Sequence, residues 1–469
     1  MSTAKISIPT KPLDVLILAA GLGTRMKSTV AKVLHKLDGR PLVAHVCRTA
    51  AKLDARTIYV VVGHQAETVQ AVVETALPNL QAGFVNQVEQ RGTGDAVLAA
   101  EKAFISGDST VLILSGDVPL VKIDTLRDLI ATHEMHNAAC TILTVRMENP
   151  TGYGRIVRDD GGQFRKILEQ RDANEEERQI REVNSGIYCF DSLKLFAALK
   201  QVRSTNDQGE YYLTDVPSIL KDKGDCVRLF LHSDVREVSG INTRAELAEF
   251  ENLLRRRTVR RLMIDAGVTF IDPSHAYISS DAQIGRDCII HPGVHVAGSS
   301  VIGEACELHP GSHIVNSRLG NRVTVKDHCL IVDSDIADDC SIGPFAHLRM
   351  GTRMHDSAVV GNFVEVKKST IGRGTKSMHL TYLGDATIGE HTNIGAGTVT
   401  CNYDGKHKHP TTIGDNVRIG SDTMLVAPVS VGDSAVTAAG SVVIEDVPPK
   451  ALVAGVPAKL KKKFTEDKS

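Results

Sequence analysis

The sequence predicts two domains of different class: a doubly wound α/β domain, followed by an all-β coil of stacked parallel strands. In the second half, an aliphatic residue recurs at every sixth position from Ile278 to Ile314. This period does not fit a helix or one strand, but it is typical of a short strand plus a turn. In the first half, apolar runs at 15–20, 58–62 and 111–114 alternate with helix-like stretches, as in α/β domains. A chain of 469 residues also exceeds the usual size of one core.

Glycine follows the repeat residue at nine corners of the expected coil, for example in Ile284-Gly285 and Ile388-Gly389. We expect glycine there because each corner needs either a positive φ or close packing of the backbone. The regularity breaks at 343–368 and again at 401–410. Loops that leave a stacked coil commonly bind ligands, so both segments are candidate binding regions.

The composition argues against several classes of partner. A formal net charge of −2 gives no general attraction to nucleic acid or anionic membranes, and no stretch approaches the ~18 apolar residues of a membrane span. The nine cysteines are scattered without a Cys-x-x-Cys pair, which favours reduced thiols. We therefore expect a cytoplasmic protein with neither a nucleic-acid nor a membrane partner. The lysines at 459 and 461–463 are expected to form a solvated tail.

One long helix is predicted between the domains. Residues 244–265 contain neither Pro nor Gly and mix Leu, Glu and Arg, ahead of Gly267 and Pro273. The expected domains are therefore 1–243 and 266–469, joined by a helix at 244–265. The arginine runs at 255–257 and 260–261 are attributed to a solvated helix face rather than to an anion site.

The first candidate site is a glycine loop with two cations. The segment Leu18–Met26, with sequence LAAGLGTRM, follows the first apolar run, and Lys32 comes shortly after it. The loop matches neither the dinucleotide fingerprint nor the Walker loop. Its backbone N–H groups can still face phosphates, while Arg25 and Lys32 can neutralise developing charge. By itself the pattern fits a structural tight turn equally well.

A family resemblance sharpens this interpretation. Leu18–Met26 and Lys32 resemble the signature of sugar-phosphate nucleotidylyltransferases, and three further segments agree with it: 87–94, Gly116-Asp117, and 152–155 with Glu169, Asn184 and Gly186. Together with the hexapeptide repeats, they resemble the bacterial family of bifunctional N-acetylglucosamine-1-phosphate uridylyltransferases / glucosamine-1-phosphate N-acetyltransferases, from about Leu13 to Pro457. The resemblance implies a Rossmann-like N-terminal domain and a left-handed parallel β-helix.

The resemblance also implies the roles of the first site. Asp117 and Asn242 would hold Mg²⁺, while Arg25 and Lys32 would support transfer of the uridylyl group from UTP to N-acetylglucosamine 1-phosphate, with release of pyrophosphate. The implied UTP- and sugar-binding residues are Leu18, Ala19, Ala20, Gly21, Lys32, Gln87, Gly92, Thr93, Gly154, Glu169, Asn184 and Asn242. Ser115 departs from the tyrosine of the usual metal-strand motif.

In the second half, the segments 361–368 and 379–385 resemble the family's acetyltransferase pattern. A solitary histidine is usually structural, but the resemblance makes His379 the general base for acetyl transfer from acetyl-CoA. The implied ligands of glucosamine 1-phosphate are Arg349, Lys367, Tyr382, Asn393 and Lys408, and those of acetyl-CoA are Asn402, Tyr403, Ser421 and Ala439. Gly455 lies where the family usually has a nearby arginine. The resemblance further implies a homotrimer, with the acetyl-transfer site between subunits, and UDP-N-acetylglucosamine for cell-envelope polymers as the final product.

A motif outside the family pattern remains. The segment His291-Pro-Gly-Val-His295 recurs eighteen residues later as His309-Pro-Gly-Ser-His313. Four imidazoles could bind Zn²⁺ or Ni²⁺ if they converged, although repeated corner turns explain the pattern more simply.

Two other functions remain open at this point. One is a nucleotidylyltransferase with a single activity, whose β-helix only oligomerises or regulates, and such enzymes lack the His379 and Lys408 constellation. The other is a noncatalytic regulatory subunit, which has no need for the charged residues Arg25, Lys32 and Asp117.

Overall fold

The computed structural model describes residues 11–104, 107–204 and 209–463. Contacts between Cα atoms divide the chain into two compact parts. The boundary lies between Phe250 and Glu251, inside helix α7 (Arg244–Asp265). Among the described residues, no helix combines the length and the apolar character needed to cross a bilayer.

The N-terminal part is built on a mixed sheet with the strand order β11-β7-β10-β6-β1-β4-β5. These strands are β1 (Leu13–Leu18), β4 (Thr57–Val62), β5 (Ala82–Asn86), β6 (Thr110–Ser115), β7 (Cys140–Arg146), β10 (Glu182–Asp191) and β11 (Val227–His232), with the hairpin strands β8 (Arg155–Arg158) and β9 (Phe164–Leu168) beside β10 and the separate pair β2 (Lys36–Leu37) and β3 (Arg40–Pro41). Strands β1, β4, β5 and β6 are parallel, whereas β10 runs antiparallel to β6 and β7. The sequence did not reveal this reversal, because the residues that a buried strand tolerates do not depend on whether it runs parallel or antiparallel to its neighbours.

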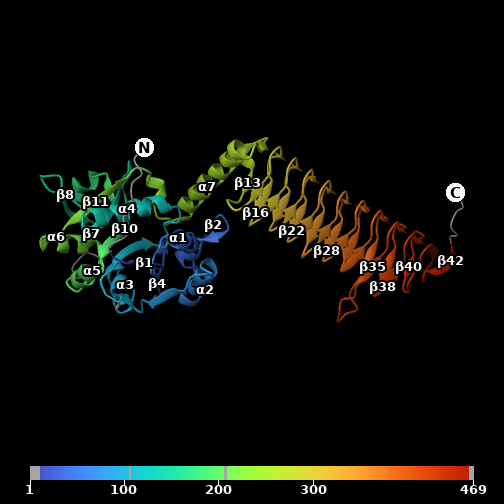
Figure 1. Ribbon diagram of the computed structural model, residues 1–469, viewed down its shortest axis with the longest axis horizontal. Coiled ribbons are helices and arrows are strands. Elements are labelled where there is room, and N and C mark those ends of the chain that lie inside the picture. Colours follow the sequence, from blue (N-terminus) through green and yellow to red (C-terminus); the bar gives the residue numbers. More distant parts are fainter. Residues whose placement is uncertain (1–10, 105–106, 205–208, 464–469) are drawn as a thin grey trace. The chain divides into compact units, whose positions relative to one another are not determined.

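Helices cover both faces of this sheet (Figure 1). They are α1 (Leu42–Ala50), α2 (Ala66–Ala76), α3 (Thr93–Ala99), α4 (Ile123–Met135), α5 (Ser192–Leu199) and α6 (Val216–Asp222). Alternate residues of β1 point to opposite cores: Val15 and Ile17 pack with α1, α2 and α4, and Leu16 packs with α3, α5 and α6. The arrangement is the doubly wound, Rossmann-like one that the sequence predicted, and it places the strand ends β1 and β6 side by side.

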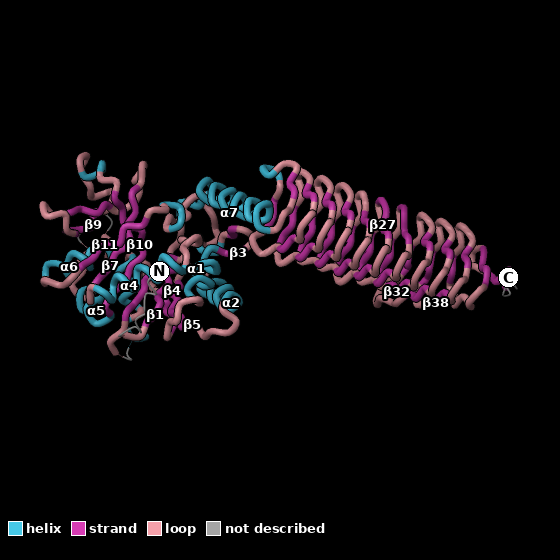
Figure 2. The backbone as a smooth tube through the Cα atoms, turned by 45° about the horizontal axis from the view of Figure 1, so that its top comes forward, coloured by secondary structure: helices cyan, strands magenta, loops and turns pink. Residues whose placement is uncertain are grey.

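The C-terminal part is a left-handed parallel β-helix of stacked coils (Figure 2). Its first sheet contains β12 (Thr269–Phe270), β15 (Ile289–Ile290), β18 (Glu307–Leu308), β21 (Thr324–Val325), β24 (Ser341–Ile342), β27 (Val359–Asn362), β30 (Lys376–His379), β33 (Asn393–Ile394), β36 (Arg418–Ile419), β39 (Val436–Thr437), β41 (Ala451–Ala454) and β42 (Lys459–Lys463). The second contains β13 (Tyr277–Ile278), β16 (His295–Ala297), β19 (His313–Val315), β22 (Leu330–Val332), β25 (His347–Arg349), β28 (Glu365–Lys367), β31 (Tyr382–Gly384), β34 (Val399–Cys401), β37 (Met424–Val426) and β40 (Val442–Val443). The third contains β14 (Gln283–Ile284), β17 (Val301–Ile302), β20 (Arg318–Leu319), β23 (Asp335–Ile336), β26 (Arg353–Met354), β29 (Thr370–Ile371), β32 (Ala386–Ile388), β35 (Thr411–Ile413) and β38 (Val429–Val431).

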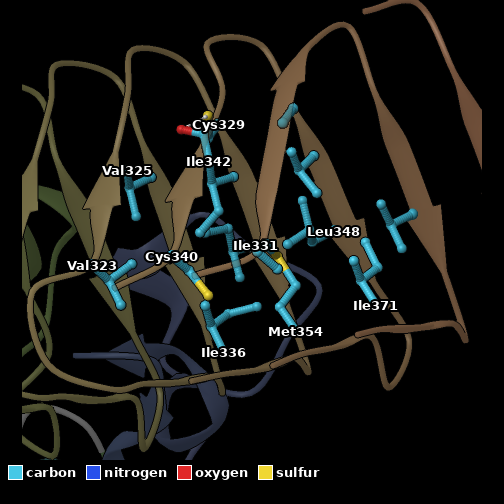
Figure 3. Close-up of a cluster of buried hydrophobic side chains, with 14 of the residues drawn as sticks. Val323, Val325, Cys329, Ile331, Ile336, Cys340, Ile342, Leu348, Met354 and Ile371 are labelled. Atoms are coloured by element: carbon cyan, nitrogen blue, oxygen red, sulfur yellow. Dashed lines mark hydrogen bonds between the residues drawn. The ribbon is translucent and has the colours of Figure 1, made fainter. Parts of the chain in front are cut away.

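The six-residue repeat points into the core of this coil. Ile278, Ile314 and the five repeat residues between them are all buried. Tyr277 pairs with His295, eighteen positions on, so three hexapeptides complete one coil. From Val301, which pairs with Arg318, many coils contain one residue fewer. This explains why the strict period ends after Ile314, and Figure 3 shows the aliphatic core continuing through Ile331, Ile342 and Leu348.

Eight of the nine corner glycines are required by close packing rather than by a positive φ, and Gly343, with a φ of 91°, is the exception. A Cβ on Gly303 would lie 2.5 Å from the carbonyl oxygen of Gly320, and one on Gly372 would lie 2.3 Å from that of Gly389. Positive φ angles occur two residues later instead, as at Ala305 (φ 54°). Of the two explanations that the sequence left open, contact between successive coils therefore decides every one of these positions except Gly343.

Only one of the two expected breaks interrupts the coil. Across 343–368 the strands stay paired, with Ser341 opposite Val359 and His347 opposite Glu365, so that prediction was wrong. Polar residues there change the outer surface without lengthening the coil. The second break is a true insertion, because Val399 pairs with Met424, twenty-five positions on. Its residues 402–410 project from the stack and contain a Tyr403–Lys408 bridge (Figure 1).

Both ends of the β-helix differ from the expectations. The lysines at 459 and 461–463 belong to β42, which is exposed but pairs antiparallel with β41 rather than forming a free tail. At the other end, Val259 and Leu262 of α7 join the β-helix core. The arginine runs are not wholly a solvated face, because Arg255 and Arg261 donate hydrogen bonds to the carbonyls of Ser274 and Ser280, at 2.8 and 3.3 Å.

Candidate active sites

The glycine loop after β1 packs directly against the turn that carries Lys32. Gly23 has a φ of 67°, and a Cβ there would lie 2.4 Å from the Cβ of Lys32. Any other residue would therefore meet both backbone strain and a steric clash. The short 3-10 helices Thr24–Met26 and Lys32–Leu34 carry Arg25 and Lys32.

A cavity of about 410 Å³ opens beside this loop. It is bounded by the ends of β1 and β6, at the edge where doubly wound sheets bind their ligands. The lining contains Leu18, Ala19, Ala20, Gly21, Lys32, Gln87, Gly92, Thr93 and Asp117 from the predicted set. Residues from four separate segments of the sequence therefore meet in one place.

Two cations and two oxygen-bearing side chains converge beside the cavity. The Lys32 ammonium donates to the carboxylate of Asp117 and, at 2.9 Å, to Oδ1 of Asn242. Arg25 donates to the same Asn242 oxygen at 2.8 Å. Asp117 and Asn242 are 125 positions apart in sequence but lie within hydrogen-bonding reach of one nitrogen atom.

The start of α7 fixes the backbone at Asn242. Glu246 accepts hydrogen bonds from the backbone N–H groups of Asn242 and Thr243, at 2.6 and 3.0 Å, and Thr243 accepts one from Glu246 N–H at 3.2 Å. This reciprocal arrangement is a capping box. Asp117 is held from the same side, since its carbonyl accepts from Ile241 N–H at 3.0 Å.

Asp117 is buried, but its surroundings favour the ionised carboxylate. Burial by itself raises the pKa of a carboxyl, but the adjacent Lys32 ammonium and a hydrogen bond from Ser115 outweigh it, so the pKa of Asp117 lies below its ordinary value. A negative charge is therefore held at this point across the neutral pH range.

The donor set suits a hard divalent cation. A carboxylate and an amide oxygen are the ligand types that Mg²⁺ takes, together with water and phosphate oxygens. In this structure the Lys32 ammonium bridges both oxygens, which shows that the pair can face one cation at the same time.

One wall of the cavity is shaped by the segment 87–94. The amide nitrogen of Gln87 donates to the carbonyl of Gly92 at 3.1 Å and to Asp95 at 2.9 Å, which uses both of its protons. Gly92 has a φ of 112°, and a Cβ there would lie 2.6 Å from the carbonyl oxygen of Tyr211. The Thr93 hydroxyl accepts from Leu213 N–H at 3.1 Å.

Gly154, Glu169 and Asn184 form a second group, which does not line this cavity. The carbonyl of Gly154 accepts from Asn184 N–H at 2.9 Å, and the Asn184 amide donates to the Tyr188 hydroxyl at 2.6 Å. Glu169 accepts from the Thr214 hydroxyl at 3.1 Å. Burial raises the pKa of Glu169, and the Thr214 hydrogen bond only partly opposes it.

Several residues of the cavity lining were not in the predicted binding set, among them Gln90, Ser115 and Glu210. Gln90, which donates to the carbonyl of Ala20 at 2.8 Å, could have been found inside the quoted 87–94 segment. Ser115 was noted only as a departure, yet its hydroxyl bonds to Asp117. Glu210 carried no local signal, because the contact between Tyr211 and the Gly92–Gly94 segment brings it there.

The second candidate site begins with a cluster of charges on the β-helix. Lys367 is buried, and its ammonium lies 3.8 Å from the carboxylate of Asp385. The side chain of Lys408, from the projecting insertion, lies against Lys367 and lowers the pKa of its ammonium. Arg349, beside Lys367 in the strand register, donates to Glu365 at 2.6 and 2.8 Å. Two adjacent ammonium groups form an anion-binding arrangement, because a bound anion would remove their repulsion.

Tyr382 and Asn402 complete this cluster. The Asn402 amide donates to Asp385 at 2.6 Å and to the Tyr382 hydroxyl at 3.5 Å. A Cβ on Gly384 would lie 2.3 Å from the Tyr382 hydroxyl, so glycine is needed for the tyrosine ring to cross this point. Asp385, which lies in the 379–385 segment but was not singled out from the sequence, therefore links Lys367 and Asn402.

His379 lies at the end of β30 and is exposed. Its Nδ1 lies 2.6 Å from Oδ1 of Asn362, its neighbour in the strand register. With Oδ1 as the acceptor, Nδ1 carries the proton and Nε2 keeps its lone pair. Asn362 was within the quoted 361–368 segment but was not singled out.

The strand register places the candidate acetyl-transfer residues His379, Ser421 and Ala439 in line along the first sheet. Counting along its pairings puts His379, Ala396, Ser421 and Ala439 one above another at the same corner. Asn393 lies three positions before Ala396, at the other end of the strand, and so does not join the cluster around Lys367. Tyr403 is in the insertion, where its hydroxyl donates to the carbonyl of Gly405 at 2.7 Å.

The repeated His-Pro-Gly motifs do not bring four imidazoles together. His291 stacks on His309 at 4.8 Å, and His295 stacks separately on His313 at 4.4 Å. The four imidazoles therefore do not converge, because strand alternation and the corner send the two ends of each motif to different columns, in agreement with the simpler explanation by repeated corner turns.

The fold and these sites define a class: a nucleotidyltransferase domain followed by a hexapeptide-repeat transferase domain. Family models agree, matching a MobA-like NTP transferase domain at 15–185, a GMPPB C-terminal domain at 272–376 and bacterial transferase hexapeptide repeats at 410–445. The chain is 46% identical over 440 residues to Bifunctional protein GlmU of Syntrophomonas wolfei, covering 94% of this chain and 96% of the relative. It is 47% identical to the proteins of the same name from Heliobacterium modesticaldum (93% and 94% covered) and Streptomyces avermitilis (94% and 91% covered). The chain belongs to the GlmU family of bifunctional proteins.

Proposed function

We propose that this chain transfers an acetyl group from acetyl-CoA to glucosamine 1-phosphate and then a uridylyl group from UTP to the N-acetylated sugar phosphate. Membership of a family of bifunctional proteins supports two transferase activities in one chain. The observation that carries the assignment is the presence of two separate constellations, around Lys32 and around Lys367, on the two domains. A β-helix that only oligomerised would not need the buried Lys367 beside Lys408.

For uridylyl transfer, the 410 Å³ cavity would receive the nucleotide. The glycine loop would face the phosphates, Arg25 and Lys32 would neutralise their charge, and Gln87 would present Oε1 to the N3–H of uracil because its amide protons are already engaged. Gly154, Glu169 and Asn184 would hold the sugar. Asp117 and Asn242 would bind Mg²⁺, which supplies charge neutralisation and alignment of phosphate oxygens when bound.

The reaction itself needs no protein base. An oxygen of the sugar phosphate attacks the α-phosphorus of UTP, the bond to the bridging oxygen breaks, and pyrophosphate leaves. Since the nucleophile is already an anion, the side chains act by orientation and by electrostatic stabilisation of the transition state.

For acetyl transfer, Nε2 of His379 would take a proton from the sugar amine as its nitrogen attacks the thioester carbonyl. The C–S bond then breaks, and the imidazolium returns the proton to the coenzyme A thiolate. Lys367, Lys408 and Arg349 would hold the sugar phosphate, with Tyr382 and Asn393 as further ligands. Asn402, Tyr403, Ser421 and Ala439 would contact acetyl-CoA.

Two further proposals concern the protein in the cell. We propose a homotrimer, because hexapeptide-repeat proteins often trimerise and because the candidate acetyl-transfer residues are spread over a corner and the projecting insertion. A cytoplasmic location is favoured by the nine cysteines, all of which are free thiols. Light scattering that gave the mass of a single chain at working concentration would contradict the trimer.

The test is a reciprocal pair of variants in one coupled assay. His379→Ala should abolish acetylation but leave uridylylation of supplied N-acetylglucosamine 1-phosphate nearly intact, and Asp117→Asn should do the opposite. Both folded variants would be assayed with glucosamine 1-phosphate, acetyl-CoA, UTP and Mg²⁺, and with each omitted in turn. Failure of the parent protein to acetylate, or loss of both activities in either folded variant, would refute the two-site assignment.

A further inference from the structure

Three metal-ligating side chains lie together on the outer surface of the β-helix, apart from both candidate sites. Ile290 pairs with Leu308, so the next residues, His291 and His309, occupy the same position on successive coils. Their imidazole rings are 4.8 Å apart with an angle of 11° between their planes. Glu307 lies two residues before His309 and therefore points to the same side of its strand.

The distances within this cluster are those of a coordination site. Nε2 of His291 lies 3.0 Å from Oε1 of Glu307, and Nε2 of His309 lies 3.5 Å from the same oxygen. One ligand atom from each residue falls within 4.8 Å of the other two. In tetrahedral zinc sites, arms of about 2.0–2.1 Å place the donor atoms about 3.4 Å apart. Small side-chain rotations would therefore bring all three donors to one ion.

We propose that His291, Glu307 and His309 bind a divalent transition metal, with Zn²⁺ as the fitting ion and water in the fourth position. Two imidazole nitrogens and one carboxylate oxygen suit Zn²⁺, Co²⁺ or Ni²⁺, whereas Mg²⁺ prefers oxygen ligands alone. The site is thus chemically distinct from the all-oxygen pair Asp117 and Asn242. Without metal, the Glu307 carboxylate accepts a hydrogen bond from the His291 imidazole and lies 3.5 Å from Nε2 of His309, which keeps the donors assembled.

The three side chains are partly exposed, at 25%, 41% and 29%, so an ion can reach them. Lys326 follows Val325, the partner of Leu308, and so occupies the same register position one coil further on. Its positive charge opposes a bound cation, so we expect affinity of about micromolar rather than nanomolar order. A bound ion would join two successive coils and stabilise the folded state by mass action.

The chain contains its own control. His295 and His313 have the same eighteen-residue offset and stack in the same way, at 4.4 Å and 15°. Their column continues to the ring of Tyr277, 4.3 Å from His295, instead of meeting a carboxylate. Within the part of the chain that the structure describes, they belong to no group of three metal-ligating residues. They should therefore bind metal weakly.

The experiment measures zinc binding by the full chain, stripped with EDTA and then kept in excess Mg²⁺. The proteins are the parent chain, the double variant His291→Gln/His309→Gln and the control His295→Gln/His313→Gln. We expect one zinc equivalent to be lost in the first variant and kept in the control, with a matching loss of the visible absorption of tetrahedral Co²⁺. At zinc about a hundredfold above Kd, the unfolding temperature of the parent should rise by about 5 °C, and that of the first variant should not.

A third variant guards against a folding defect. Glu307→Gln keeps the size of the side chain and a hydrogen-bond acceptor but removes the charge, and it should weaken zinc binding at least about tenfold. Equal zinc binding by the two double variants, full affinity in Glu307→Gln, or no zinc-dependent change in the parent would overturn the proposal. The last result would leave the cluster as a His291–Glu307 hydrogen bond with His309 stacked beside it and nothing more.

Discussion

Replacing Asn362 by Asp should move the acid side of the pH profile of acetyl transfer. Asn362 Oδ1 lies 2.6 Å from Nδ1 of His379, so the variant puts a full negative charge beside the proposed base. His379 is exposed, so a water-like dielectric applies and the attraction to the imidazolium is about 1.5 kcal/mol, or about one pH unit. Only the neutral imidazole can take a proton, and the carboxylate favours the charged form. The pH at which acetylation falls to half should therefore rise by about one unit.

The assay follows coenzyme A release across pH at saturating substrates. The sugar amine titrates identically with both enzymes, so the difference between the profiles reports the histidine. Asn362→Ala should lower kcat about ten- to hundredfold without this displacement, because it removes the orienting acceptor but adds no charge. Uridylylation by the same samples is the internal control. An unchanged profile in Asn362→Asp, together with full activity in Asn362→Ala, would refute the role of this contact.

Three further predictions concern single side chains. Asp117→Asn should slow uridylyl transfer at least about a hundredfold, because the ionised ligand is lost, and equal rates at saturating Mg²⁺ would contradict this. Lys408→Ala should raise the pKa of Lys367 toward its ordinary value and raise the KM for glucosamine 1-phosphate about tenfold; an unchanged KM would remove the phosphate role. Burial raises the pKa of Glu169 above its value in the unfolded chain, so ionisation of this carboxyl disfavours folding. The stability that the neutral carboxyl contributes is fully present below the pKa of the unfolded chain, and it is lost as the pH rises through the pKa of the folded protein. Glu169→Gln should therefore unfold at a higher temperature than the parent at pH 7 but not near pH 4, while the KM for the sugar phosphate rises. A uniform shift at both pH values would contradict that account.

Much of the fold followed from repeated local patterns. The buried residues Ile278–Ile314 of the repeat were predictable because each coil must bury the same position again. The continuation through 343–368 was not, because polar substitutions on the outer surface resemble a break although the inward residues remain apolar. The antiparallel direction of β10 was not predictable either, because burial restricts the residue types in a strand but not the direction in which it runs.

Some residues of the candidate sites could likewise be predicted from the sequence, and others could not. Family resemblance pointed to Lys32, Asp117 and Asn242, yet nothing local to Asn242 indicated that its oxygen meets Lys32. Glu210 was missed because it reaches its site through contacts between distant segments, whereas Asp385 lay in the 379–385 segment but its link to Lys367 could not be seen without the strand register.

By itself the sequence determined the two classes of domain, their order and the aliphatic core, because these depend on periodicity and on which residues avoid water. Only the tertiary structure decided which distant side chains meet: Lys32 with Asp117 and Asn242, and Lys367 with Lys408. It also separated the four histidines into two columns and gave only one column a carboxylate. Strand register and chain crossing set such contacts, and neither is written in the local sequence.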